Sequence, residues 1–96
     1  MKAYLQIDLK ITDLEGFMQY AQRVPALIEK HAGHYLVAGV EPTVIESNGS
    51  QVEHSVIIEF PTRIHAEQFL NERASSDLHE IWEQTTTSRI LLLEGA

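Results

Sequence analysis

The chain opens with KAYLQIDLKI, residues 2–11, in which apolar and polar side chains alternate. Such period-two alternation is typical of a β-strand that has one packed face and one wetter face. Residues 52–60, VEHSVIIEF, alternate in the same way, with His54 among the apolar positions. The two stretches therefore predict a sheet with one buried face and one open face. The open face is where a ligand or a second subunit would bind.

Helical periodicity follows the first strand, because apolar side chains recur three and four residues apart over residues 14–28. Thr12 and Glu15 have the spacing of a capping box, which predicts a helix with Thr12 as its N-cap. We expect this helix to run to Ala32. Gly33 then provides the left-handed residue that commonly ends a helix.

The second half of the chain predicts a further series of short elements separated by turn and cap signals. In chain order we first expect a strand over residues 34–40 that resumes over 43–46, a hairpin turn over 47–50 with an Asn-Gly pair, and the strand over 52–60. A helix capped by Thr62 follows, with Ile64, Phe69 and either Leu70 or Ala66 facing inward. After it we expect a break over 71–76, a helix over 77–84 and a strand over 88–94.

The resulting order, β-α-β-β-α-β, predicts an α+β fold of the ferredoxin-like type, with an antiparallel sheet and both helices on one face. All 96 residues form a single domain in this interpretation. The strands over 2–11 and 52–60 lie side by side in the middle of the sheet. Their polar sides share the open face, which carries Tyr4, Gln6, Asp8, Ser55, Ile57 and Glu59.

Composition narrows the possible partners. Fourteen acidic residues against seven basic ones give a formal net charge of −7, which repels phosphate backbones and argues against nucleic acid as a partner. The absence of cysteine excludes disulfides, thiolate nucleophiles and cysteine-based zinc sites. No apolar run approaches the ~18 residues of a membrane span, and the start does not read as a signal peptide. We therefore expect a cytoplasmic protein with no membrane partner.

Several stretches, taken in order, resemble a known family. They are Lys2-Ala3-Tyr4, Thr12-Asp13, Val24-Pro25-Ala26, His31-Ala32-Gly33, residues 35–39, Glu59-Phe60-Pro61-Thr62, Ala66, Phe69 and Leu93-Glu94-Gly95. Over essentially its whole length the chain resembles domain-of-unknown-function family 1330, within the dimeric α+β barrel superfamily. The resemblance implies a ferredoxin-like subunit whose open sheet face pairs with that of a second copy. Related branches include cofactor-free monooxygenases, haem-degrading monooxygenases and isomerases, but the family itself supplies no established catalytic residues.

The chain departs from the usual pattern of this family at three places. An arginine is common in the family where Ala38 stands, and another is frequent where Trp82 stands. A Ser-Pro-Glu-Tyr stretch is replaced by Ser-Ser-Asp-Leu at residues 75–78, which puts Leu78 in place of the tyrosine. If the family's groups bind an anion, this chain has lost much of that capacity, so an identical ligand is not implied.

Tyr4, Asp8, Glu59 and Arg89 form one candidate site, because they belong to neighbouring strands. Two carboxylates close together inside a dimer could share a proton and act as acid and base. The alternative is a hydrogen-bonded subunit interface in which an Arg–carboxylate pair fixes the register. Tyr20 and Tyr35 are further candidates, because each could contribute a hydroxyl to a pocket between helix and sheet. The alternative is that each buries its ring and directs its hydroxyl to water.

Two histidine patterns carry weaker hypotheses. His31 and His34 could bracket a metal, but a metal site needs three or four ligands and no carboxylate is adjacent. His79 and Trp82 resemble the histidine–tryptophan pair of the haem-degrading relatives. Those enzymes also use an asparagine, which the first strand here lacks, and Trp82 also suits an apolar anchor. We therefore expect neither a metal nor a cofactor.

These observations favour a homodimer that binds a small apolar or aromatic molecule between helices and sheet. If it is an enzyme, the expected reaction is proton transfer or cofactor-free oxygenation, with Asp8 and Glu59 as catalytic candidates. Tyr4 and Tyr20 are then the ligand-binding candidates. The alternative is a non-catalytic module that binds a metabolite or only assembles.

Overall fold

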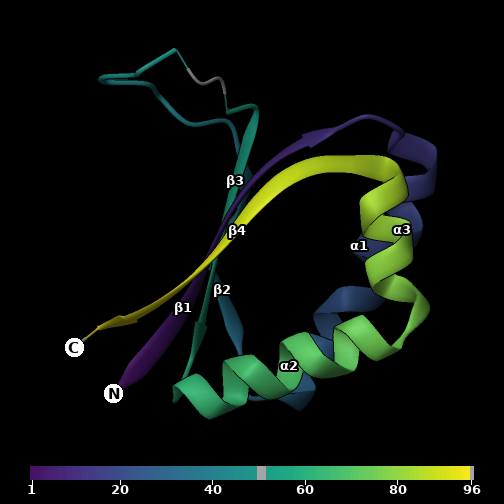
Figure 1. The fold of residues 1–96 in the computed structure, drawn as a ribbon, viewed down its shortest axis with the longest axis vertical. Helices are drawn as coiled ribbons and strands as arrows, with labels where there is room; N and C mark the ends of the chain where they lie inside the picture. The colour runs from purple at the N-terminus through teal and green to yellow at the C-terminus, as the bar shows by residue number, and fades with distance from the viewer. Residues whose placement is uncertain (50–51, 96) are drawn as a thin grey trace.

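The computed structural model describes residues 1–49 and 52–95 and consists of a four-stranded antiparallel sheet with the helices on one side of it (Figure 1). In chain order the elements are β1 (Lys2–Ile11), α1 (Leu14–Lys30), β2 (His34–Val40), β3 (His54–Phe60), α2 (Arg63–Ser75), α3 (Asp77–Thr85) and β4 (Thr86–Gly95). The strand order is β2-β3-β1-β4. This is the predicted ferredoxin-like α+β fold, and the predicted adjacency of β1 and β3 is confirmed.

β1 lies in the middle of the sheet and supplies the centre of the core. Its register places Ile7 between Val56 of β3 and Ile90 of β4. Because directly opposed residues of paired strands share a face, the apolar sides of these strands all meet the helices. Along β1, burial alternates as the sequence predicts, and the fully or almost fully buried positions are Ala3, Leu5, Ile7 and Leu9.

The same registers define the other side of the sheet, which no helix covers. We call this side the open face. It carries Tyr4, Gln6 and Asp8 from β1, Ser55, Ile57 and Glu59 from β3, His34, Val37 and Val40 from β2, and Arg89, Leu91 and Leu93 from β4. Polar side chains predominate on β1, and apolar ones are found mainly on β2 and β4, so this face combines both kinds of surface.

The helices close the core with aromatic side chains. In α1, Tyr20, Val24 and Ile28 are buried, and Tyr20 packs on Trp82 of α3 with ring centroids 4.9 Å apart. In α2 the buried apolar residues are Ala66 and Phe69, as predicted, whereas Ile64 is 64% exposed and its predicted inward position is wrong.

The first helix differs from its prediction at both ends. Asp13, not Thr12, is the N-cap, and its carboxylate accepts a hydrogen bond from the backbone N–H of Gly16. The backbone N–H of Thr12 instead donates to the carbonyl of Thr85 at 2.8 Å, which ties this residue to the end of α3. At the other end α1 stops at Lys30, and Ala32 rather than Gly33 is the left-handed residue, with a φ of 62°.

Three further boundaries correct the sequence prediction. Residues 43–46 do not resume a strand, because the pairing of β2 with β3 ends at Val40 and Ser55. The Asn48-Gly49 pair therefore lies in a longer connection rather than a tight hairpin, and Ser50 of the predicted turn lies outside the described residues. α2 continues through most of the predicted break at 71–76 and ends at Ser75, so that only Ser76 separates it from α3.

None of the helices in the described part of the chain is both long enough and apolar enough to cross a membrane.

Candidate functional site

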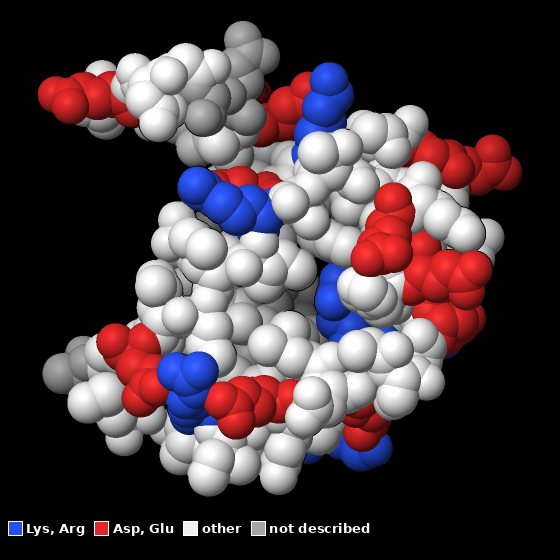
Figure 2. Space-filling model, viewed as in Figure 1, with Lys and Arg blue, Asp and Glu red and all other residues white. Residues whose placement is uncertain are grey.

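A cavity of about 330 Å³ lies between the core face of the sheet and the helices. Its walls come from β1, β2, β3 and β4 on one side and from α1, α2 and α3 on the other, and most of the lining side chains are aliphatic or aromatic. Figure 2 shows a hollow between sheet and helices, with basic (blue) surface on its wall. Its volume is at the lower end of the range of small-molecule sites, which is roughly 300–1,000 Å³.

Arg73 and Tyr20 are the principal polar groups on the cavity wall. Arg73 is the only Lys or Arg among the described lining residues, and it is 5% exposed. Its Nε donates a hydrogen bond of 2.8 Å to the hydroxyl oxygen of Tyr20, which connects α2 to α1. The guanidinium carbon also lies 5.6 Å from the ring centroid of Tyr20 and 5.3 Å from that of Trp82. The aromatic faces therefore stabilise the buried charge.

Nε of Arg73 has the Tyr20 oxygen as its acceptor, but other donor capacity at this point of the wall is unpaired. Nη2 of Arg73 is buried and has no hydrogen-bond partner among the described residues. Burial raises the pKa of the Tyr20 phenol above 10.0, and this outweighs the opposite effect of the charge and hydrogen bond of Arg73. Tyr20 is therefore a neutral hydroxyl near pH 7, and its oxygen is already occupied by Arg73.

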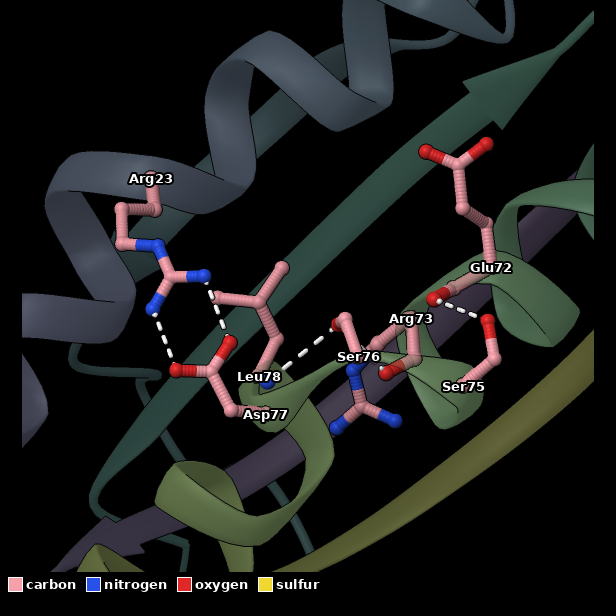
Figure 3. A network of polar contacts seen from close by, with 7 residues as sticks. All are labelled: Arg23, Glu72, Arg73, Ser75, Ser76, Asp77 and Leu78. Carbon is pink, nitrogen blue, oxygen red and sulfur yellow. Dashed lines mark hydrogen bonds and ion pairs between the residues drawn. The ribbon is translucent and has the colours of Figure 1, made fainter.

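The acidic residues nearest to Arg73 along the chain are engaged elsewhere. Glu72 accepts hydrogen bonds from Lys30 at 2.8 Å and from His31 at 3.3 Å, and these interactions lower its pKa below 4.5. Asp77 forms a two-pronged pair with Arg23 at 2.6 and 2.9 Å. In Figure 3 the Asp77 carboxylate turns toward Arg23, whereas the guanidinium of Arg73 points away from it. Arg73 thus has no carboxylate partner among the described residues.

Trp82 and Tyr35 complete the polar part of the lining. The indole N–H of Trp82 donates to the hydroxyl of Ser88 at 2.8 Å, so this side chain is a buried anchor with a satisfied N–H. The other half of the proposed haem pair, His79, contacts Glu83 at 3.2 Å and does not line the cavity. Tyr35 is 38% exposed, and burial raises its pKa above 10.0, with a smaller contribution from Tyr20 in the same direction.

The carboxylates predicted from sequence lie on the open face, which is the opposite side of the sheet from the cavity. Asp8 pairs with Arg89 at 2.9 Å and accepts a hydrogen bond from Ser55 at 3.4 Å. Glu59 instead contacts Lys2 at 3.2 Å and His34 at 3.4 Å.

The structure does not bring Asp8 and Glu59 together within one protomer. Glu59 is opposite Tyr4 on β1, so four residues of that strand separate it from Asp8. At ~3.4 Å per residue this is roughly 13 Å. Of the four site residues predicted from the sequence, Tyr20 alone lines the cavity, whereas Tyr4 shares the open face with the two carboxylates.

Sequence reasoning missed Arg73. The sequence predicts a break in the helix at residues 71–76, because this stretch is polar and Ala74 is its only apolar side chain. A single arginine at the buried position of such a stretch carries no periodic signal. Arg73 becomes visible as a candidate only when α2 is seen to continue and to direct it toward Tyr20.

The histidines do not assemble a metal site. His31 contacts Glu72, whereas His34 contacts Glu59 on the open face. Within residues 1–49 and 52–95, no three His, Cys, Asp or Glu side chains gather as metal ligands would.

Comparison with known proteins identifies the family to which the chain is similar. The model of the family described as a domain of unknown function (DUF1330) matches residues 2–96. Among curated proteins, none matches the chain.

Solved structures share the fold at low sequence identity. A protein of unknown function from Rhodopseudomonas palustris is 14% identical, with a TM-score of 0.72 over 99% of this chain and 82% of that one. SnoaB, a cofactor-independent oxygenase from Streptomyces nogalater, is 11% identical, with a TM-score of 0.67 over 99% and 93% of the two chains. A dimeric ferredoxin-like protein of unknown function from Jannaschia sp. CCS1 is 12% identical, with a TM-score of 0.56 over 99% and 100%. At these identities the likeness concerns the fold alone.

Proposed function

Since this chain belongs to a family described only as a domain of unknown function (DUF1330), we propose its function from the geometry of its own cavity: it binds a small apolar or aromatic molecule there. The observation that carries the proposal is the mostly apolar cavity of about 330 Å³ with Tyr20 and Arg73 on its wall. Ligand sites typically combine such a lining with a few polar groups that fix orientation. A domain of this size has a small hydrophobic core, so an internal cavity lowers its stability. Such a cavity is more readily explained if it binds a ligand.

We also propose that two copies pair through their open faces to form a dimeric α+β barrel. On the open face Leu91 and Leu93 are next to each other along β4 and are 39% and 45% exposed, and Val40 on the opposite edge strand is 53% exposed. Exposed apolar side chains on a sheet face without helices support a protein partner. The Jannaschia protein is described as dimeric, which supports a dimer for this fold. In this interpretation Tyr4 and the Asp8–Arg89 pair belong to the subunit interface, where an Arg–carboxylate pair helps to fix the register.

A cofactor-free oxygenase or isomerase reaction needs an acid–base group beside its ligand. Asp8 and Glu59 do not meet this requirement for the cavity, because they lie on the other side of the sheet. No carboxylate or histidine is among the described residues that line the cavity. We therefore favour non-catalytic binding over turnover. A reaction in this cavity would rely on the Tyr20 hydroxyl and the Arg73 charge instead.

The first prediction tests the cavity with 2-naphthylmethanol, a neutral, mainly apolar probe. We expect isothermal titration calorimetry to give a dissociation constant on the order of 0.1 mM, as suits a ligand of this size. Ala21→Phe places a ring in the cavity wall and should weaken binding at least about tenfold, because the ring competes for the same space.

Ala26→Phe is the matched control, because Ala26 lies on the same helix but does not line the cavity. Near-ultraviolet circular dichroism is then used to check that both variants are folded. Equal affinity of the two variants, or no binding to the unaltered protein, would show that the cavity is not the site.

A further inference from the structure

The polar groups of the cavity are unbalanced in one direction. Arg73 contributes a positive charge and an unpaired Nη2, and Tyr20 contributes a hydroxyl hydrogen that no described residue accepts. The described lining residues include no Asp, Glu, Asn, Gln, Ser or Thr side chain that could act as acceptor. A buried donor without an acceptor is costly, and a buried charge without a counter-charge is more so.

We propose that the ligand of this cavity is an apolar or aromatic carboxylate whose anionic group binds to Arg73 and Tyr20. The inference rests on the proposed function and adds the chemical class of the ligand. One carboxylate oxygen would accept from Nη2 of Arg73, and the group would also accept the hydrogen of Tyr20. A carboxylate suits this position because it is acceptor-only when ionised and offers about four lone-pair sites to the planar guanidinium.

The position of Arg73 supports a ligand-binding role more than a purely structural one. The exposed ion pairs that link the helices, such as Arg23 with Asp77, already satisfy the neighbouring carboxylates without Arg73. A side chain needed only to fill space between Tyr20 and Trp82 requires no charge, because well-packed apolar residues are often at least as stabilising as buried ions. The presence of a charged residue at position 73 is explained if an anionic ligand pairs with it.

The second prediction compares two probes of almost the same shape, 2-naphthoate and 2-naphthylmethanol, by isothermal titration calorimetry at pH 7. We expect 2-naphthoate to bind the unaltered protein roughly ten- to a hundredfold more tightly, the range that hydrogen bonds to charged groups contribute. Arg73→Met keeps an unbranched apolar chain and should abolish this preference while leaving the neutral probe bound. Tyr20→Phe removes only a hydroxyl and should reduce the preference.

Arg23→Met is the matched control for charge, because it removes an arginine whose partner is the surface residue Asp77. It should leave the preference for 2-naphthoate unchanged. Equal affinities of the two probes for the unaltered protein would overturn the carboxylate proposal and leave the proposed binding function intact, and so would a preference that survives Arg73→Met. Failure of both probes to bind would contradict the binding function itself. If Arg73→Met does not fold, the comparison on the unaltered protein and on Tyr20→Phe still decides the question.

Discussion

Gly33 shows how one missing side chain shapes the core beneath the cavity. A Cβ at this position would lie 2.6 Å from Cε1 of Phe60 and 2.9 Å from Cγ2 of Ile28. Both neighbours are buried, and Phe60 is fully enclosed. The glycine is therefore required for the close approach of the chain to Phe60, rather than for the left-handed conformation expected from the sequence, which Ala32 adopts.

The third prediction follows from this contact. Gly33→Ala should lower the free energy of unfolding by about 1–3 kcal/mol, because the core must shift to admit the methyl group. Gly95→Ala is the control: its added Cβ would meet Tyr4 at an ordinary 3.9 Å, so a change within about 0.5 kcal/mol is expected. Urea unfolding followed by circular dichroism measures both values. Indistinguishable midpoints for the two variants would show that the space around Gly33 is not limiting.

At the scale of the elements, α1 is fixed to α2 and α3 by side chains as well as by packing. Arg23 of α1 pairs with Asp77 of α3, and Lys30 of α1 pairs with Glu72 of α2 at 2.8 Å. These pairs are largely exposed, and exposed pairs contribute little individually. Together they link the helices that carry Tyr20 and Arg73.

The fourth prediction concerns the acid dependence of the Arg23–Asp77 pair. The hydrogen bonds from Arg23 hold the pKa of Asp77 below its ordinary value of 3.8. A carboxyl whose pKa is lowered by folding stabilises the fold above its unfolded pKa, and this contribution is lost as the pH falls through the folded pKa. Asp77→Asn should therefore lower the urea midpoint slightly at pH 7 and leave it unchanged near pH 2.

Glu29→Gln is the control, because it removes a carboxylate from α1 at an exposed position where no side-chain partner is seen in the described chain. Its midpoint should match that of the unaltered protein at both pH values. An Asp77→Asn variant that is equally destabilised at pH 7 and near pH 2 would mean that the lowered pKa does not contribute to stability.

The elements show what local sequence can and cannot predict. The alternation of apolar and polar residues in β1 predicts correctly which of its side chains are buried. Successive side chains of a strand point to opposite faces of the sheet, and β1 is paired on both sides along its length. Thr62 is confirmed as an N-cap, because its hydroxyl accepts from the backbone of His65 within the same helix. Thr12 fails as a cap because a distant carbonyl, that of Thr85, binds its N–H. A contact between residues so far apart in the chain cannot be predicted from the local sequence pattern.

The candidate site is harder to predict than the fold for the same reason. Tyr20 could be selected from sequence as a hydroxyl on an apolar helix face. Its partner Arg73 comes from a polar stretch 53 residues later, and the two meet only when α1 and α2 pack together. Asp8 and Glu59 have the residue types of an acid–base pair, but strand register separates them and places both on the open face. Residue types indicate which reactions a side chain could take part in. Strand register and helix packing determine which side chains lie in the same site.

At the scale of the whole molecule, the two faces of the sheet have different proposed roles. We propose that its covered face encloses a ligand-binding cavity and that its open face pairs with a second copy of the chain. Ile57 tests the second purpose because it lies near the middle of the open face, opposite Gln6 of β1 and Val37 of β2. A lysine there would place a charge in the proposed interface and leave the core untouched. Ile64→Lys is the matched control, since Ile64 is 64% exposed on α2.

The fifth prediction, and the most direct test of the division between the two faces, is the mass in solution by sedimentation velocity at micromolar concentration. The unaltered protein and Ile64→Lys should sediment at twice the 10.9 kDa mass of the protomer, and Ile57→Lys should sediment as the protomer. Protomers in all three samples, or a dimer that persists in Ile57→Lys, would contradict it.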